Sequence, residues 1–248
     1  ISFVLGLDDA VTESMGVLPM LASALAVAYY VVPSEAGMPL WSRSLAGATV
    51  FLTFVTLSPI GVSAADGALS SGDAGVLTIF FAASLIPIIA ASMNVLQTAR
   101  SNWGAATYSS GSTAVMFGMF FLVASAVGSL FTASDAHSAG EISHMLGPMD
   151  TLFLWGAMGL IAVGGAMTCF PAASGRSLYS DQSSRTVLWM FAGGAIIAFL
   201  FSMSAAMTSS AMTDVVDANE LELYDMTAIE QLNTLASLAF YAVVIASM

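Results

Sequence analysis

Long apolar stretches alternate with short polar segments along the whole chain. Seven of these stretches are about as long as the roughly 20 helical residues that cross a bilayer core of about 30 Å. They lie at residues 13–33, 41–65, 74–98, 111–133, 150–171, 186–210 and 226–248. None shows the alternation of polar and apolar positions that the strands of a membrane β-barrel need. The pattern predicts an all-α transmembrane helix bundle of about seven spans, forming one domain over residues 1–248.

The composition supports a membrane protein and excludes several other classes. Of the 248 residues, 58% are hydrophobic and 8% are charged, whereas about a quarter are charged in a soluble domain. With four arginines, no lysine and sixteen acids, the net charge is −12, so the chain lacks a basic surface for nucleic acid. Without lysine there is no retinal Schiff base, and the single Cys169 has no partner for an internal disulfide. Residues 1–7 have neither the basic region of a signal peptide nor an initiating Met, so we do not interpret them as a signal peptide and expect a processed chain.

The charged residues predict the orientation of the helices. All four arginines fall in or beside the first, third and fifth connections, which share one side of a seven-helix bundle, while fourteen of the sixteen acids fall on the other side. Because basic residues favour the cytoplasmic side, we expect the N-terminus outside and the C-terminus inside. The acidic outer face is suited to a basic soluble carrier such as a cytochrome c, and adaptation to a salty or acidic exterior explains it equally well.

Few residues offer catalytic or metal-binding chemistry. The chain has no phosphate-binding loop, no CxxC and no HExxH. His137, Glu141 and His144 are spaced at i, i+4 and i+7, so one helical face would bring them together as a weak divalent-metal site in the outer loop. The alternative is a solvated acidic loop with two ordinary histidines.

The acids and methionines of the spans also allow two interpretations. Glu13, Asp150 and Glu230 lie near the outer ends of spans, where a carboxylate reaches headgroup water; a role in a proton path is the alternative. The sixteen methionines are scattered through the spans, which predicts that they fill gaps in the core rather than bind copper(I). Small residues inside the spans predict closely packed helices, among them Gly156, Gly159, Gly164, Gly165, Gly193 and Gly194.

Three segments together resemble a known family. The stretch AYYVVPSEAGMPLWSRSLA, residues 28–46, resembles the connection between the sixth and seventh helices of subunit I in C-type (cbb3) haem-copper oxidases. LQTARSN at 96–102 is similar to a cytoplasmic loop of that family, and GAMGLIAVGGAMTCFPAASGR at 156–176 is similar to its tenth helix. The resemblance implies that the chain corresponds to helices six to twelve of subunit I, and that another polypeptide supplies the first five helices.

The histidines that hold metal in this family are absent. The resemblance implies a copper ligand near Glu13, a pair of copper ligands at Ser63 and Ala64, and two haem ligands at Met149 and Thr151. No histidine occurs in any predicted span. Met149 is a weak candidate for a haem ligand, because methionine can bind haem iron. The copper site, however, has lost imidazole altogether, so we expect no oxygen reduction by this chain.

The resemblance and the missing ligands together predict a noncatalytic, subunit-I-like protein that holds the other membrane subunits of a respiratory or electron-transfer complex. The expected location is an energy-transducing membrane, and haem is expected in partner subunits rather than in this chain. Two alternatives stay open. One is an electron-transfer subunit that holds a haem or a quinone together with a partner chain. The other is a transporter of ions or small solutes, whose polar path would use serines such as Ser202, Ser204, Ser209 and Ser210.

Overall fold

The computed structural model describes residues 9–56, 74–135, 141–177, 180–215 and 227–247. Near several helix ends only the backbone is described, as it is over 9–18, 141–153 and 209–215. Within these residues the chain forms helices and no strands. This confirms the prediction of an all-α protein.

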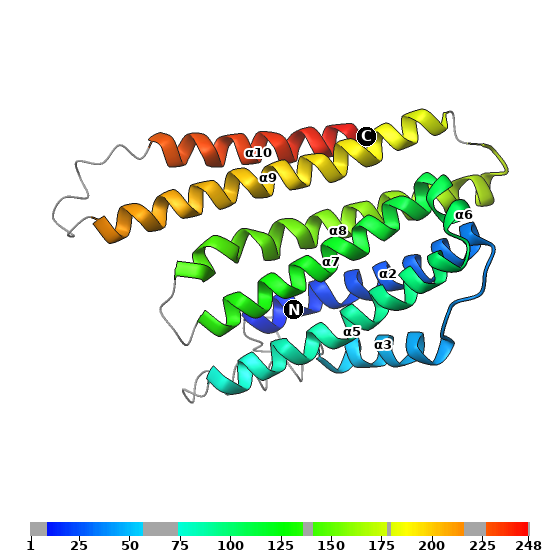
Figure 1. Ribbon diagram of the computed structural model, residues 1–248, viewed down its shortest axis with the longest axis horizontal. Coiled ribbons are helices and arrows are strands. Elements are labelled where there is room, and N and C mark those ends of the chain that lie inside the picture. Colours follow the sequence, from blue (N-terminus) through cyan, green and yellow to red (C-terminus); the bar gives the residue numbers. More distant parts are fainter. Residues whose placement is uncertain (1–8, 57–73, 136–140, 178–179, 216–226, 248) are drawn as a thin grey trace.

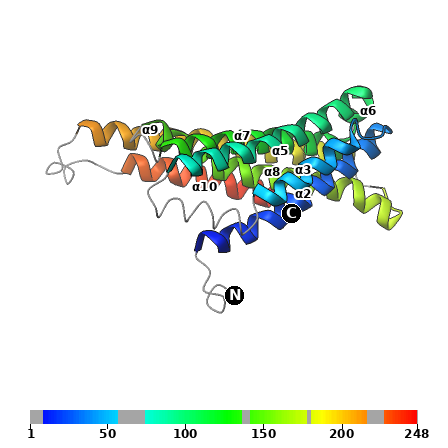
Figure 2. The ribbon, with the colours of Figure 1, turned by 90° about the horizontal axis from the view of Figure 1, so that it is seen from below.

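The helices run along one common long axis (Figure 1). They are α2 (Asp9–Ala36), α3 (Arg43–Thr56), α5 (Ala74–Ser101), α6 (Trp103–Tyr108), α7 (Ser110–Asp135), α8 (Glu141–Ser174), α9 (Asp181–Val215) and α10 (Thr227–Ser247). The central helices α2, α5, α7 and α8 pack around a shared core, α3 packs on α5, and the α9–α10 pair lies against α8 at the opposite edge. From below, the helices keep this common direction (Figure 2).

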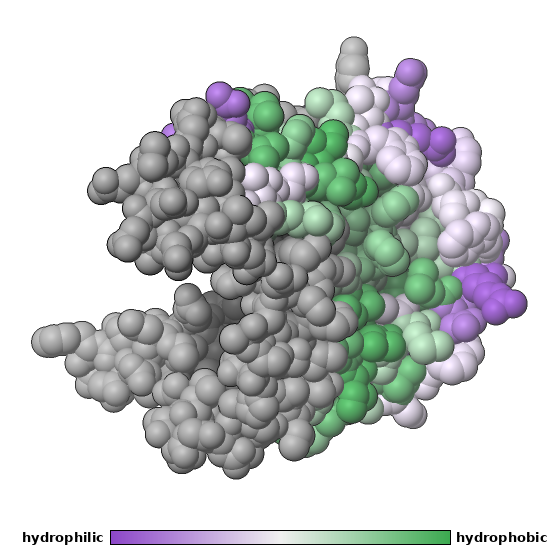
Figure 3. All heavy atoms as spheres, turned by 60° about the vertical axis from the view of Figure 1, so that its left-hand side comes forward, coloured by the Kyte–Doolittle hydropathy of each residue, from purple (hydrophilic) through white to green (hydrophobic). Residues whose placement is uncertain are grey.

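Three helices in the described part of the chain are long and apolar enough to cross a membrane. Their apolar segments are Ser110–Gly128, Leu154–Ser174 and Asp181–Thr208. Helix α3 is also apolar, but the structure describes 14 residues of it. Figure 3 shows apolar side chains across the middle of one face, with most of the hydrophilic ones gathered toward one end. The chain is therefore a helical membrane protein.

The core between α2, α5, α7 and α8 is filled by medium-sized and large apolar side chains. Among the largest that are fully buried are Phe121, Leu25 and Leu160. Met119 and Met158 are buried in the same cluster. These two methionines therefore behave as the gap fillers that the sequence predicts, since a flexible thioether adapts to an irregular space.

Glycines end two of the helices. Gly37, just beyond α2, has φ +62°, and the next N–H, that of Met38, donates to the Pro33 carbonyl oxygen at 3.1 Å. Gly175, just beyond α8, has φ +66° and donates to the Pro171 carbonyl oxygen at 3.0 Å. Both helices therefore end where a residue without Cβ adopts the left-handed conformation. This turn of the backbone lets an N–H beyond the helix donate a hydrogen bond to a carbonyl oxygen of the last turn.

The helix boundaries differ from the prediction in two respects. Helices α8 and α9 contain 34 and 35 residues, well beyond the predicted spans at 150–171 and 186–210. Hydropathy marks only the part of a helix that lipid can surround, whereas the backbone hydrogen bonds continue until a breaker is reached. Helix α6 also occupies a predicted connection, and it is separated from α5 by Asn102, whose φ of −145° and ψ of 66° are not helical.

Helices α7 and α8 approach each other closely at glycines. A Cβ added to Gly164 of α8 would lie 2.6 Å from the Gly111 carbonyl oxygen, and one added to Gly118 of α7 would lie 3.0 Å from the Ala157 carbonyl oxygen. Both pairs of positions are seven residues apart along their helices, so the contact recurs after two turns. The predicted close packing is confirmed here, but Gly193 of α9 has no neighbour within 4 Å of a Cβ.

These distances predict opposite outcomes for one substitution at two glycines. We expect Gly164→Val to destabilise the bundle by about 1–3 kcal/mol, because the added methyl groups would overlap α7 and force the pair apart. Gly193→Val, the matched control, should change the stability little. Thermal unfolding of the purified chains in detergent, followed by circular dichroism, measures both. Equal stability of the two variants would contradict the close α7–α8 contact.

Candidate functional site

Polar side chains are concentrated on one face of α5. Asn94 and Thr98 are four residues apart on α5, so they lie one above the other along the helix. Asn102 follows after four more residues, directly beyond the last residue of α5. Asn94 and Thr98 are completely buried. A buried polar group that lacks a hydrogen bond costs free energy. We therefore expect both side chains to have hydrogen-bond partners within the protein.

The amide of Asn94 pairs with both backbone groups of Ser42. Its Oδ1 accepts a hydrogen bond from the Ser42 N–H at 3.0 Å, and its Nδ2 donates to the Ser42 carbonyl oxygen at 2.9 Å. The Ser42 hydroxyl in turn accepts from the Leu45 N–H at 3.1 Å, which caps the start of α3. Asn94 therefore fixes the residue from which α3 begins.

The other two side chains hold the rest of the connection between α2 and α3. Thr98 Oγ1 accepts a hydrogen bond from the Trp41 N–H at 3.0 Å and donates to the Asn94 carbonyl oxygen at 2.7 Å. Asn102 Nδ2 donates to the carbonyl oxygen of Ala36, the last residue of α2, at 2.9 Å. We call Asn94, Thr98 and Asn102 the α5 clamp, because together they bind both ends of this connection.

A second polar contact joins α2 to α3 directly. The Tyr29 hydroxyl lies 2.6 Å from Thr49 Oγ1. Since Thr49 donates its own proton to the Ala46 carbonyl oxygen at 2.9 Å, Tyr29 is the donor of the shared hydrogen bond. One turn further along α3, Thr53 donates to the Thr49 carbonyl oxygen at 2.8 Å. These hydroxyls are all used in holding helices, and none is left as a nucleophile or a proton carrier.

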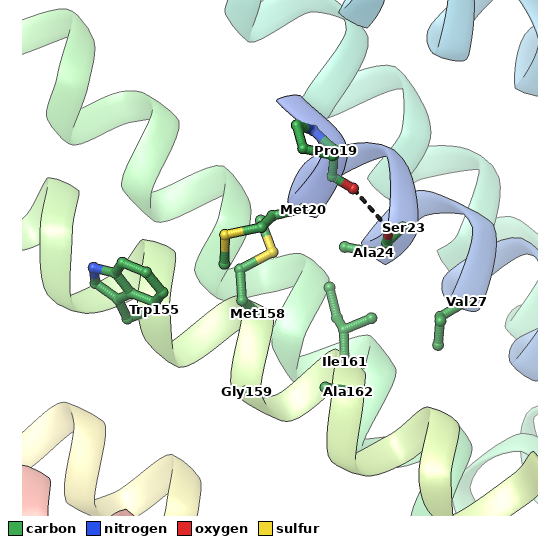
Figure 4. A pocket seen from close by; sticks show the side chains of 10 residues that line it. All are labelled: Pro19, Met20, Ser23, Ala24, Val27, Trp155, Met158, Gly159, Ile161 and Ala162. Carbon is green, nitrogen blue, oxygen red and sulfur yellow. Dashed lines mark hydrogen bonds between the residues drawn. The ribbon is translucent and has the colours of Figure 1, made fainter. Parts of the chain in front are cut away.

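An apolar groove of about 560 Å³ runs between α2 and α8 (Figure 4). The side chains of Met20 and Met158 meet across it, and Trp155 lies at one end. The Ser23 hydroxyl, which also lines the groove, donates to the Pro19 carbonyl oxygen at 2.7 Å. The volume is within the range of small-molecule sites, but the lining offers few polar groups to orient a ligand.

The residues proposed from the sequence as a metal site are only partly placed. Glu141 and His144 lie in the first turns of α8, three residues apart on one face, while their side chains and the whole of His137 lie outside the described residues. Met149 follows in the same helix, again with its backbone alone described. Where side chains are described, no three His, Cys, Asp or Glu residues come together as a possible metal site.

The remaining sequence candidates are spread over different helices. Glu13 and Asp150 lie in the N-terminal parts of α2 and α8 with their backbones alone described, as does Thr151, and Ser63 and Ala64 lie outside the described residues. Glu230 is exposed in the first turn of α10. Among Glu13, Asp150 and Glu230 the structure describes the side chain of Glu230 alone, so the proton path stays a prediction.

Of the serines proposed for a transport path, Ser204 is bonded within its own helix, and for the others the transport alternative stays a prediction. The Ser204 hydroxyl donates to the Leu200 carbonyl oxygen at 2.8 Å, within its own helix. Thr208 donates to the Ser204 carbonyl oxygen in the same way, also at 2.8 Å. The side chains of Ser209 and Ser210 lie outside the described residues. A hydroxyl bonded to its own helix offers little to a passing ion.

The α5 clamp was not singled out from the sequence. LQTARSN at 96–102 contains two of its three members, but the resemblance directs attention to the basic residue of that segment. The available signal was the spacing of Asn94, Thr98 and Asn102 within an otherwise apolar stretch. Their partners lie 52 to 66 residues away along the chain, so no local pattern identifies them.

Comparisons with known proteins add no family to these observations. No protein-family model matches the sequence, and no curated protein matches it significantly.

The α5 clamp predicts a specific effect of removing one amide. We expect Asn94→Leu to cost about 1–3 kcal/mol of stability, because the N–H and carbonyl of the half-buried Ser42 lose their partners. Met93→Leu is the matched control, since the neighbouring Met93 side chain is half-exposed. Thermal unfolding in detergent gives the stability, and limited proteolysis reports whether residues 37–42 become accessible. An Asn94→Leu chain as stable and as protease-resistant as the control would show that the pairing is dispensable.

Proposed function

We propose that this chain is a noncatalytic membrane subunit, resembling the C-terminal half of subunit I of C-type haem-copper oxidases, that holds partner subunits in a respiratory or electron-transfer complex. The observation that carries this proposal is a regular apolar seam on α9 that is largely exposed in the described part of the chain. Only its first member, Trp189, makes an aromatic contact that the structure records, edge-on to Phe117 of α7 with ring centroids 5.3 Å apart. A seam of this kind is what a scaffold needs and what an isolated transporter or enzyme does not.

The α9 seam follows a regular spacing. Trp189, Gly193, Ile196, Leu200, Met203 and Met207 succeed one another at intervals of four, three, four, three and four residues. This is the repeat with which one helix presents knobs to another. Four of these six residues are large apolar side chains exposed on the surface of the chain, namely Trp189, Ile196, Leu200 and Met207.

Gly193 makes the α9 seam suitable for a close partner. A Cβ at this position would meet no atom within 4 Å, so nothing in the described part of the chain uses the space. Inside the bundle the same residue type brings α7 and α8 together at Gly111 and Gly164. Helices in lipid associate through packing at small residues rather than through the hydrophobic effect, so an open glycine within a regular seam favours a partner helix over lipid.

The strongest stretch of the resemblance is consistent with a structural role. Residues 28–46 contain Tyr29, Ala36, Trp41 and Ser42, which are the partners of Thr49 and the α5 clamp. In this chain, the stretch on which the resemblance rests forms a joint between two helices. Another polypeptide would then supply the five helices that the resemblance places before α2.

We further propose seven spans with the N-terminus outside, in a bacterial or archaeal plasma membrane or the mitochondrial inner membrane. Support comes from the arginines: Arg43 starts α3, Arg100 lies in the last turn of α5, and Arg176 and Arg185 flank the connection from α8 to α9. These helix ends lie at one end of the bundle (Figure 1). The opposite, acidic end would face outward and receive a basic cytochrome c.

The groove favours a second candidate, an electron-transfer subunit that keeps one haem. Met20 and Met158 place two thioethers within an apolar volume of about 560 Å³, and a thioether can serve as an axial ligand of haem iron. The groove adjoins the N-terminal parts of α2 and α8, where the resemblance places a copper ligand and the haem ligands. A quinone would need polar partners that this lining does not supply.

The α9 seam predicts which substitution releases the partner subunits. After purification from its native membrane in mild detergent, we expect the chain to have partner subunits bound and to show a native mass well above its own 25.5 kDa. Gly193→Leu should release those partners while the chain stays folded, since the added side chain fills only the space that a partner would occupy. Ile197→Leu, at an exposed position beside the seam, should retain them. Native mass spectrometry and circular dichroism measure the two effects.

The same samples separate the two candidates. A chain that has partners and shows no haem absorption of its own supports the scaffold. A haem band that stays with this chain and is lost in Met20→Leu/Met158→Leu supports the electron-transfer subunit instead. A chain that purifies alone, without partners in either the wild type or the Gly193→Leu form, would rule out the scaffold.

The proposed orientation predicts which side of the membrane two positions face. In a Cys169→Ser background, we expect Glu230→Cys to react with an impermeant maleimide in intact cells, because the start of α10 would face outward. Ser177→Cys, at the arginine end, should react only after the membrane is permeabilised. The reverse labelling pattern would invert the bundle, and labelling of both positions in intact cells would contradict an odd number of crossings between them.

A further inference from the structure

The arginine end of the bundle carries charge that the fold leaves without a counter-ion. We use this name for Arg43, Arg100, Arg176 and Arg185, which are all exposed. Their carboxylate neighbours in sequence are Glu35 and Asp181, yet within the described ranges none of the four makes an ion pair with either. A guanidinium that no carboxylate neutralises is free to bind an anion from outside the chain.

Helix stability does not explain the position of Arg43 either. Arg43 is the first residue of α3 and Arg185 lies in the second turn of α9. The start of a helix carries partial positive charge, so a cation there is unfavourable unless an anion accompanies it. Arg43 thus lies where the fold alone would favour an acid, and α3 has no acid in its first turn. Helix α9 instead has Asp181 in its first turn, and Arg100 lies in the last turn of α5, where a cation is favoured.

Arg185 is held in a defined position. Its Nη2 donates to the Tyr108 carbonyl oxygen at 2.9 Å, and its Cζ lies 5.5 Å from the centroid of the Tyr108 ring. The contact links the start of α9 to the end of α6. A guanidinium has five N–H donors, so most of them stay available, and a side chain that is already ordered loses less entropy when it binds a ligand.

Aromatic residues accompany the arginines at the same end. Trp41, Trp103 and Trp189 each lie two to four residues from an arginine in sequence, and all three are more than half exposed. Exposed tryptophan and tyrosine mark the depth of the lipid headgroups in membrane proteins. Tyr108 is 75% exposed as well. The arginines therefore lie at the depth where lipid phosphates are found.

We propose that the arginine end binds the headgroups of anionic phospholipids, with the Arg185 guanidinium, positioned by Tyr108, as a phosphate-binding group. Charge complementarity selects this partner: the unpaired cations lie beside an aromatic belt, and phosphate accepts several N–H donors from one guanidinium. The same lipids would supply the missing anion at the start of α3. The inference depends on the membrane location of the chain and not on its proposed role in a complex.

The test uses the purified full chain without partners. Native mass spectrometry compares the binding of phosphatidylglycerol and phosphatidylcholine with identical acyl chains. We expect phosphatidylglycerol to bind more tightly, and Arg185→Gln to weaken its binding roughly fivefold, as expected for one arginine near a charged lipid surface. Tyr108→Leu keeps every charge and should also weaken binding, because it removes the ring that holds Arg185. Asp181→Asn, in the same turn region of α9, should bind the anionic lipid at least as well as the wild type.

Three results would overturn the proposal. The first is equal binding of the two lipids by the wild type. The second is an unchanged affinity for phosphatidylglycerol in Arg185→Gln, when circular dichroism shows that this variant is folded. The third is stabilisation of the chain by inorganic phosphate to the same extent as by phosphatidylglycerol, which would assign the arginine end to a soluble anion. If instead an acidic segment of a partner protein occupies this end, the isolated chain will show no preference between the lipids.

Discussion

The hydrogen bonds between Asn94 and Ser42 are the interaction on which the arrangement of the first helices depends. A membrane protein cannot leave a buried amide to be satisfied by lipid, so each polar group placed inside must be paired within the protein. Asn94 meets this requirement with two bonds to one residue, at 3.0 and 2.9 Å. Because Thr98 and Asn102 bind the same connection, the end of α2 and the start of α3 are both set by a single face of α5.

This use of polar side chains leaves few of them for chemistry. Only 8% of the residues are charged, and the buried polar residues of α3 and α5 bond mainly to backbone atoms. Tyr29 and Thr49 are used in the same way: the Tyr29 hydroxyl donates to Thr49 Oγ1, and the Thr49 hydroxyl donates to the Ala46 carbonyl oxygen. The polar groups in the described interior of the bundle thus serve mainly to join helices.

Glycine has opposite roles inside and outside this bundle. Gly164 lets α8 lie against the Gly111 carbonyl, whereas Gly193 faces space that no other part of the described chain enters. The first contact is complete within the chain, and the second is half of a contact. The surface of the molecule is likewise divided, with apolar residues along the middle and the unpaired arginines at one end, so different partners would meet different parts of it.

The sequence alone determined the class of the protein and the course of its helices. Length and hydropathy are local properties, and the apolar stretches at 111–133, 150–171 and 186–210 each lie within an observed helix. The lack of histidine in the spans could also be read directly from the residues. Glycine positions indicated close packing, but not which glycines would meet a neighbour.

Only the tertiary structure decided which side chains meet. Asn94 and Ser42 are 52 residues apart, and their pairing depends on how α5 is rotated about its own axis. Hydropathy does not report that rotation, because helices that are apolar on all sides have no face that must turn inward. For the same reason, the sequence could not predict three further features. They are the outward direction of Gly193, the groove between α2 and α8, and the position of Arg185 over Tyr108.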